Sequence, residues 1–348
     1  MDEYIELLRS LISVKSFSRT EKDAANIMRQ YLSQAGIPYE TKANNTWARN
    51  LNWKEGLPVI VLDSHIDTVK PSGGYTRDPY SADVEEGVLY GLGSNDAGGP
   101  LVTLLAAFMH FYRQEDLPYN LIYVASAEEE ISGPDGLASI LEELGPFDLA
   151  IVGEPTQMHM AIAEKGLMVL DCIAHGKSGH AAREEGDNAI YKAIADIEKL
   201  KNYRFPMSSS ILGCVKLSVT MISAGTQHNV VPDACSFVVD VRTNEYYSNQ
   251  EAFKIIDQLI ESEVKPRSLR LNSSGIPVEH PIVQRGIELG LDFYGSPTTS
   301  DQAVIPYPSI KIGPGDSARS HTADEYILIS EMEEGLRIYI DLLTGLKI

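Results

Sequence analysis

The feature that most constrains the fold is the alternation of short apolar runs with helical segments in the first 155 residues. The continuous apolar runs are typical of strands buried on both faces of a sheet, and they lie at 59–62, 121–125 and 149–152. Apolar residues at helical spacing predict helices at 4–12, 20–35, 99–112 and 136–144. This alternation predicts an α/β domain with a mostly parallel central sheet covered by helices on both faces.

The pattern changes near residue 165. The predicted elements there follow the order β-α-β-β-α-β, with strands at 166–175, 213–223, 234–242 and 268–272 and helices at 187–200 and 249–263. This order predicts a small α+β domain with the split βαβ, ferredoxin-like arrangement. The first pattern returns after Pro277, with a helix to Leu291, a strand at 310–312 and a closing helix from Ser330. We therefore expect one domain of residues 1–164 and 276–348, interrupted by an inserted domain of residues 165–275.

Composition and charge narrow the class of partner. The 348 residues are enough for two domains with separate cores. A formal net charge of −20 argues against nucleic acid and anionic membrane surfaces, and it suits a substrate with a cationic end. The three cysteines form no Cys-x-x-Cys pair, and the first residues are acidic where a signal peptide is basic. We expect a cytoplasmic protein.

Histidine and acidic residues recur directly after the predicted strands. His65 follows 59–62, Glu130 follows 121–125 and Glu154 follows 149–152, while Asp96 and His321 lie in glycine-rich or polar loops. Taken singly, each motif is as readily a turn or a solvated charged segment. Their recurrence at the edge where α/β sheets bind ligands predicts a metal site. Imidazole and carboxylate ligands suit two divalent ions, with zinc expected and cobalt or manganese as substitutes.

The glycine-rich segment at 91–99 allows a second interpretation. It superficially resembles a dinucleotide-binding loop, but Asp96 stands where the third glycine would be and would repel a pyrophosphate. A nucleotide-binding oxidoreductase is therefore disfavoured. A non-catalytic binding protein on the same fold would be expected to have lost ligands, and all five are present.

With these motifs in this order, the chain resembles the metallopeptidase-type deacylases over nearly its whole length. That family includes acetylornithine deacetylase, succinyl-diaminopimelate desuccinylase, aminoacylase and the glutamate-releasing carboxypeptidases. The resemblance implies that Asp96 bridges two metal ions. It implies that His65 and Glu154 complete one ion, and that Glu130 and His321 complete the other.

Two further residues gain roles from this resemblance. Glu129 is implied as the general base and Asp67 as the residue that orients the ligands around it. The chain departs from the family pattern at Glu128, where an aspartate is usual, and at Gly98, where a lysine is common.

The resemblance also assigns roles to three residues of the inserted domain. His180 lies in a segment that resembles the one whose histidine reaches the partner subunit's active site and stabilises the oxyanion. Asn229 and Arg242 lie in segments that resemble those holding the substrate's carboxylate. From the residues alone, a turn cap for His180 and an ordinary strand position for Arg242 are the plainer interpretations. The resemblance therefore predicts a homodimer formed through the inserted domain.

The resemblance is strongest to acetylornithine deacetylases. It predicts hydrolysis of the amide of an N-acyl-L-amino acid, with N-acetyl-L-ornithine or a close acyl-ornithine or acyl-citrulline as substrate, in arginine biosynthesis. The alternatives are an N-succinyl-amino-acid desuccinylase, including one acting on succinyl-diaminopimelate, and a dipeptidase of the same family.

Overall fold

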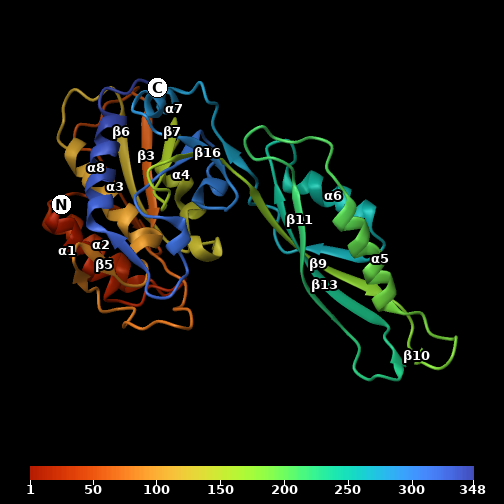
Figure 1. Cartoon of the computed structure of the whole chain (residues 1–348). Helices are drawn as coiled ribbons and strands as arrows, with labels where there is room; N and C mark the ends of the chain where they lie inside the picture. Colours follow the sequence, from red (N-terminus) through yellow and green to blue (C-terminus); the bar gives the residue numbers. More distant parts are fainter. The chain divides into compact units, whose positions relative to one another are not determined.

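A computed structural model describes all 348 residues, which form two compact units. The first unit comprises Met1–Ile162, Gly275–Tyr294 and Ser300–Ile348, and the second comprises Ala163–Ser274 and Gly295–Thr299 (Figure 1). The sequence places 295–299 in the first domain, whereas in the structure these five residues group with the second unit. The Oγ1 of Thr299 donates to the carbonyl of Lys165 and accepts from Arg242, which ties the segment to the second unit.

The first unit is built on a mixed sheet. Its strands run in the order β1 (Glu40–Lys42), β2 (Asn45–Arg49), β6 (Asn120–Ser126), β3 (Val59–His65), β7 (Leu149–Val152), β17 (Ser309–Lys311), β8 (Met160–Glu164) and β15 (Ser274–Gly275), and β16 (Phe293–Ser296) pairs with β8. The four central strands, β6 to β17, are parallel, whereas β2 and β8 join them antiparallel. The predicted α/β fold with a mostly parallel sheet is confirmed. A separate three-stranded sheet joins β18 (Tyr326–Leu328), β5 (Val88–Tyr90) and β4 (Val84–Glu85).

Helices cover both faces of this sheet. On one face α3 (Gly99–Phe111) is buried along nearly all its length and packs on β3 and β6, with α1 (Asp2–Ile12) and α8 (Ile329–Leu343) against it. Helix α2 (Lys22–Gln34) contacts α1 and β2, and α7 (Pro281–Glu288) contacts α8. The other face forms a separate apolar cluster that includes Trp47, Phe147 and the turn at 137–144.

The predicted helix at 136–144 is wrong in its form. The segment is a 3-10 turn, Leu137–Ile140, followed by one α-turn, α4 (Leu141–Leu144). Leu137 and Ile140 are both buried, and side chains three residues apart lie on one face of a 3-10 turn.

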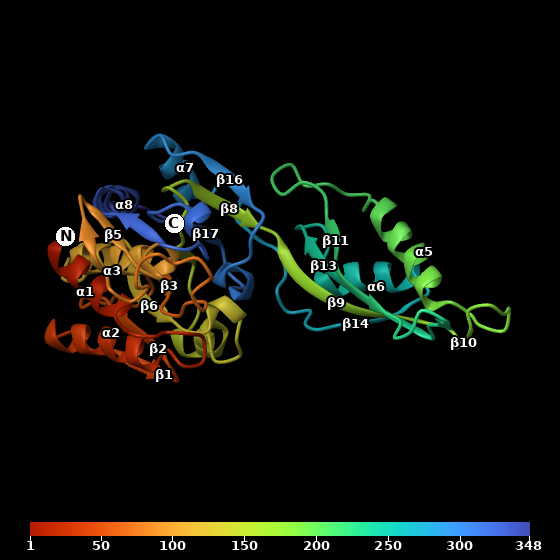
Figure 2. The same cartoon turned by 60° about the horizontal axis from the view of Figure 1, so that its bottom comes forward.

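The second unit has the predicted β-α-β-β-α-β order. Its elements are β9 (Gly166–His175), α5 (Ala189–Asn202), β11 (Lys216–Ala224), β13 (Ala234–Thr243), α6 (Asn249–Leu259) and β14 (Glu263–Pro266). The strands form an antiparallel sheet in the order β11-β13-β9-β14, and the two helices pack on one face of it (Figure 2). A short ribbon pairs β10 (Gly179–His180) with β12 (Val230–Val231).

The last strand of this unit lies earlier than predicted. The sequence placed it at 268–272 after a helix reaching 263, whereas the helix ends at Leu259 and the strand is Glu263–Pro266. Pairing with β9 explains the difference, because Val264 lies opposite Cys172 and faces the core. Neither unit contains a helix long and apolar enough to cross a membrane.

Candidate metal centre

Three adjacent parallel strands bring candidate ligands to one edge of the sheet. His65 is the last residue of β3, and β6 and β7 lie on either side of this strand. Glu129 and Glu130 begin the short 3-10 turn Glu129–Ile131 after β6, and Glu154 comes two residues after β7. Since the carboxyl ends of parallel strands meet at one edge, these side chains converge.

Two loops complete the cluster. Asp96 lies in the π-helical turn Ser94–Gly98 between β5 and α3. His321 lies between the 3-10 turn Ser317–Arg319 and β18, in a left-handed conformation with a φ of 59°. Loops more than 200 residues apart in the chain therefore meet at the strand ends.

The ligand atoms form two groups that share one carboxylate. Within each group all the atoms lie within 4.8 Å of one another: the first group is His65, Asp96 and Glu154, and the second is Asp96, Glu130 and His321. Oδ1 of Asp96 is 3.3 Å from Nε2 of His65, and its Oδ2 is 3.6 Å from Nε2 of His321. Each oxygen of Asp96 thus faces a different group.

Asp67 orients two of these segments. Nδ1 of His65 lies 2.9 Å from the carbonyl oxygen of Asp67, so Nε2 is turned toward the cluster. The Asp67 carboxylate accepts hydrogen bonds from the backbone N–H groups of Glu129 (3.0 Å) and Glu130 (3.2 Å) and from the hydroxyl of Ser18 (2.7 Å). Burial opposes its ionisation, but the hydrogen bond with His65 and these donors hold the pKa of Asp67 below its usual value.

The cluster concentrates negative charge in a buried place. Burial, reinforced by the charge of Asp96, raises the pKa of Glu154 to about 8. Burial also raises the pKa of Glu129 far above its ordinary value, with the charge of His65 opposing it and that of Glu154 adding to it. The hydrogen bond to Glu130 raises the pKa of His321 to about 9. The raised pKa values show that too little positive charge lies near these carboxyl groups. A bound divalent cation would supply that charge and lower the pKa values again.

Two buried carboxyl groups beside the cluster were not predicted. Asp63, on β3, and Asp301 are both buried, and Asp301 accepts a hydrogen bond from the hydroxyl of Ser126 at 3.0 Å. Burial raises the pKa of Asp63 to about 7 and that of Asp301 well above its ordinary value. The available signal was the position of Asp63 directly after the apolar run 59–62, since a charged residue is rarely buried without a partner.

Glu325 was also missed as a site residue. It is buried, and its carboxylate accepts three backbone hydrogen bonds from the turn that carries Asp96. Burial, together with the charge of Asp96, raises the pKa of Glu325 to about 7. The only signal in the sequence is that Glu325 comes four residues after the predicted ligand His321.

The candidate residues of the second unit fall into two places. His180 and Asn229 are neighbours, because the carbonyl of Asn229 accepts from the N–H of Ala181 at 3.0 Å. They lie by the β10–β12 ribbon, next to the start of β13, whereas Arg242 is near the end of β13 (Figure 1). With about 3.3 Å of rise per residue, the strand separates them by roughly 25 Å. Arg242 is paired with Asp240 at 2.9 Å.

Solved structures share this fold. A metallo-carboxypeptidase of the M20 family from Sulfolobus solfataricus matches with a TM-score of 0.78 and 17% identity, covering 99% of both chains. A dinuclear metal-binding peptidase of the same family from Bacillus subtilis matches with a TM-score of 0.76 and 17% identity, covering 99% of this chain and 97% of its own. At these identities the likeness shows the fold alone.

Comparison of the sequence with protein families identifies the family of this chain. The model of peptidase family M20/M25/M40 matches residues 61–345, so the chain belongs to this family of hydrolases and is an enzyme. A succinyl-diaminopimelate desuccinylase of Wolbachia pipientis subsp. Culex pipiens is 26% identical over 96% of this chain and 91% of its own length. A putative [LysW]-lysine/[LysW]-ornithine hydrolase of Pyrobaculum aerophilum is 28% identical over 94% and 93%.

Proposed function

We propose that the chain is a dinuclear metal-dependent amidohydrolase that releases an amino acid from its N-acyl derivative. The observation that carries the proposal is the pair of ligand groups sharing Asp96, each with its ligand atoms within 4.8 Å of one another. Two imidazoles and three carboxylates form a donor set that suits zinc, with cobalt or manganese as substitutes. His65 and Glu154 would hold one ion, and Glu130 and His321 the other.

Glu129 is proposed as the general base. Its carboxylate lies 4.0 Å from Nε2 of His65, beside both ligand groups, and its backbone is fixed by Asp67. When bound, the two ions would polarise the amide carbonyl and lower the pKa of the attacking water. Glu129 would take the proton from that water and return it to the nitrogen of the leaving amine.

The amino acid released is proposed to be a diamino acid. The desuccinylase and the [LysW]-lysine/[LysW]-ornithine hydrolase among the relatives carry names whose amino-acid parts have a second amino group. The net charge of −20 favours a substrate with a cationic end. N-acetyl-L-ornithine and N-succinyl-diaminopimelate both fit this class, and they differ in the acyl group.

A hydrolysis panel with the zinc- or cobalt-loaded enzyme tests the proposal. It compares N-acetyl-ornithine with N-succinyl-ornithine, each with its citrulline counterpart, and adds N-succinyl-diaminopimelate and dipeptides. Ornithine and citrulline derivatives have similar length but differ in side-chain charge, so we expect kcat/KM to favour ornithine by tenfold or more. Equal rates would contradict the diamino-acid assignment. No hydrolysis of any amide by the metal-loaded enzyme would contradict the activity itself.

A second subunit is proposed to complete the site. A substrate carboxylate cannot be held by Asn229 and Arg242 of one chain, because β13 separates them by roughly 25 Å. A homodimer solves this, with His180 and Asn229 supplied by the partner copy. The edge strand β11 and helix α5 offer a surface for it, since Ile222 and Tyr191 are 55% and 71% exposed.

Sedimentation or size-exclusion measurements test the dimer. Ile222→Asp should shift the enzyme to monomer and abolish activity while the metal-binding unit stays folded. Leu51→Asp is a matched control, because Leu51 is equally exposed at 55% but lies in the first unit. A parent enzyme that is monomeric and active would contradict the proposal.

A further inference from the structure

The carboxylate of Glu325 is placed to hold the turn that carries the shared ligand. The side chain is 2% exposed, and its Oε1 accepts hydrogen bonds from the N–H groups of Asn95 and Asp96, both at 2.9 Å. Its Oε2 accepts from the N–H of Gly93 at 3.1 Å. One buried carboxylate thus accepts hydrogen bonds from three backbone N–H groups at residues 93–96, and charge-assisted hydrogen bonds of this kind are the strong ones.

The backbone around Glu325 reinforces this connection. Its carbonyl accepts from the N–H of Gly91 at 2.9 Å. The adjacent Asp324 accepts from the N–H groups of Thr76 (2.9 Å) and Arg77 (3.0 Å), so it fixes a third loop. Asp324 has a φ of 55°, a left-handed conformation that a non-glycine residue keeps only where its surroundings hold it.

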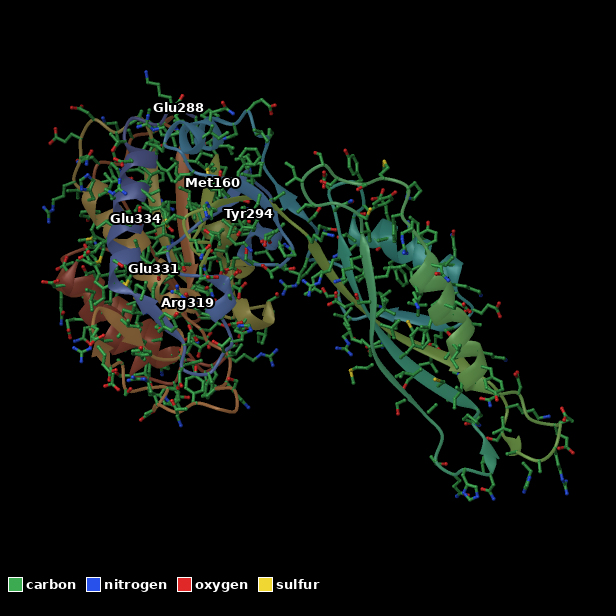
Figure 3. The ribbon with its side chains drawn as sticks, viewed as in Figure 1. Met160, Glu288, Tyr294, Arg319, Glu331 and Glu334 are labelled. Carbon is green, nitrogen blue, oxygen red and sulfur yellow. The ribbon has the colours of Figure 1, made fainter.

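The same segment is anchored on its other side. Arg319 donates two hydrogen bonds to Glu331, at 2.8 and 2.9 Å, and its guanidinium lies 4.5 Å from the ring of Tyr326. Figure 3 shows Arg319 and Glu331 side by side. His321 therefore lies within a segment, 319–326, that is fixed at both ends.

We propose that Glu325 is a positioning residue that locks Asp96 in its bridging orientation and keeps it in register with His321. The proposal rests on the proposed metal centre. In the proposed centre Asp96 would present one oxygen to each ion, so a small rotation of its turn would move both oxygens away from their groups. Because Glu325 and His321 belong to one short segment, the segment that supplies a ligand of the second group also fixes the ligand shared by both.

Glu325→Gln tests this at constant size. Whichever way the amide is turned, its NH2 group faces at least one backbone N–H of the turn, so a hydrogen bond is replaced by a donor–donor repulsion. We expect the turn to relax and both ions to bind about 10–100-fold more weakly, the range seen when a partner that orients a metal ligand is lost. Asp148→Asn is the matched control, because Asp148 also accepts a backbone hydrogen bond, from the N–H of Val59 at 2.9 Å, but at the opposite end of β3 from the cluster.

The readout is metal affinity, measured by titrating the metal-free proteins with zinc against a chromophoric chelator, with the Tm of each metal-free variant measured in parallel. E325Q should bind weakly while D148N stays within twofold of the parent, even if both lose some Tm. E325Q binding within twofold of the parent, or D148N weakened as much as E325Q, would overturn the inference. A parent that binds no zinc would instead overturn the proposed function. If E325Q does not fold, Glu325→Asp, which holds its acceptors one methylene farther from the turn, is judged by the same limits.

Discussion

Asp67→Asn probes the hydrogen bonds that fix the general base. The aspartate offers one oxygen to the N–H of Glu129 and the other to the N–H of Glu130 and the hydroxyl of Ser18. Asparagine has a single oxygen, so its NH2 group must face one of the two backbone donors. At least one N–H at this strand end then loses its acceptor.

The size of the effect follows from that count. A buried donor left without an acceptor costs about 1–3 kcal/mol. For a unit of this size each kcal/mol lowers Tm by about 2–4 °C, so we expect a fall of roughly 2–12 °C. The displaced Glu129 should lower kcat by about 10–100-fold, with KM changed less, because the base acts in the transition state.

Calorimetry of the metal-free protein and steady-state kinetics of the metal-loaded enzyme measure the two effects. Asp78→Asn is the matched control, since the exposed Asp78 also accepts a backbone hydrogen bond, from Tyr80 at 3.0 Å. It should change stability by less than about 0.5 kcal/mol and leave kcat unaltered. An Asp67→Asn enzyme with the parent's Tm and kcat would refute the reasoning.

Three further predictions follow from the site. Glu129→Gln should lower kcat by about 10²–10⁴-fold while zinc affinity stays near that of the parent, and a variant with near-normal kcat would remove Glu129 from the mechanism. The stability of the metal-free protein should fall as pH rises from about 5 through 8. The pKa of Glu154 is raised to about 8 in the folded state, so the folded protein holds this proton more tightly than the unfolded chain does. Urea titrations at several pH values measure this trend, and bound zinc should abolish it. Gly315→Ala should lower the free energy of unfolding by about 1–3 kcal/mol more than Gly290→Ala. Both glycines have a positive φ, but only at Gly315 would an added Cβ meet another group, Oδ1 of Asn95 at 2.5 Å. Equal losses of stability in urea denaturation would show that backbone strain alone matters.

The parts of the fold that the sequence predicted are those governed by burial. The runs at β3, β6 and β7 are apolar throughout because both faces of these strands are covered, and their ends place the ligands. The prediction that these ligands lie close together needed only the parallel order of the strands. Edge strands such as β1 and β15 carried no such signal, because exposed or short strands need no apolar pattern.

The rest of the site depends on contacts between distant segments. Glu325 bonds to a turn some 230 residues earlier, and no local pattern reveals where backbone N–H groups point. The hydrogen bond from Ser126 to Asp301 depends in the same way on the folded sheet, since these residues are 175 apart in the chain. The position of Arg242 relative to His180 follows from strand length, which the sequence predicted, although its pairing with Asp240 was not foreseen.

The length of β13 predicts that two inactive variants can restore each other's activity. If each active site takes its arginine from one copy and its histidine from the other, then a His180→Ala enzyme and an Arg242→Ala enzyme should rescue each other. Random reassortment of the two inactive proteins makes half of the dimers mixed, and each mixed dimer contains one site with both residues intact and one with neither. About a quarter of the parental activity should therefore return on mixing, from two proteins that have none alone.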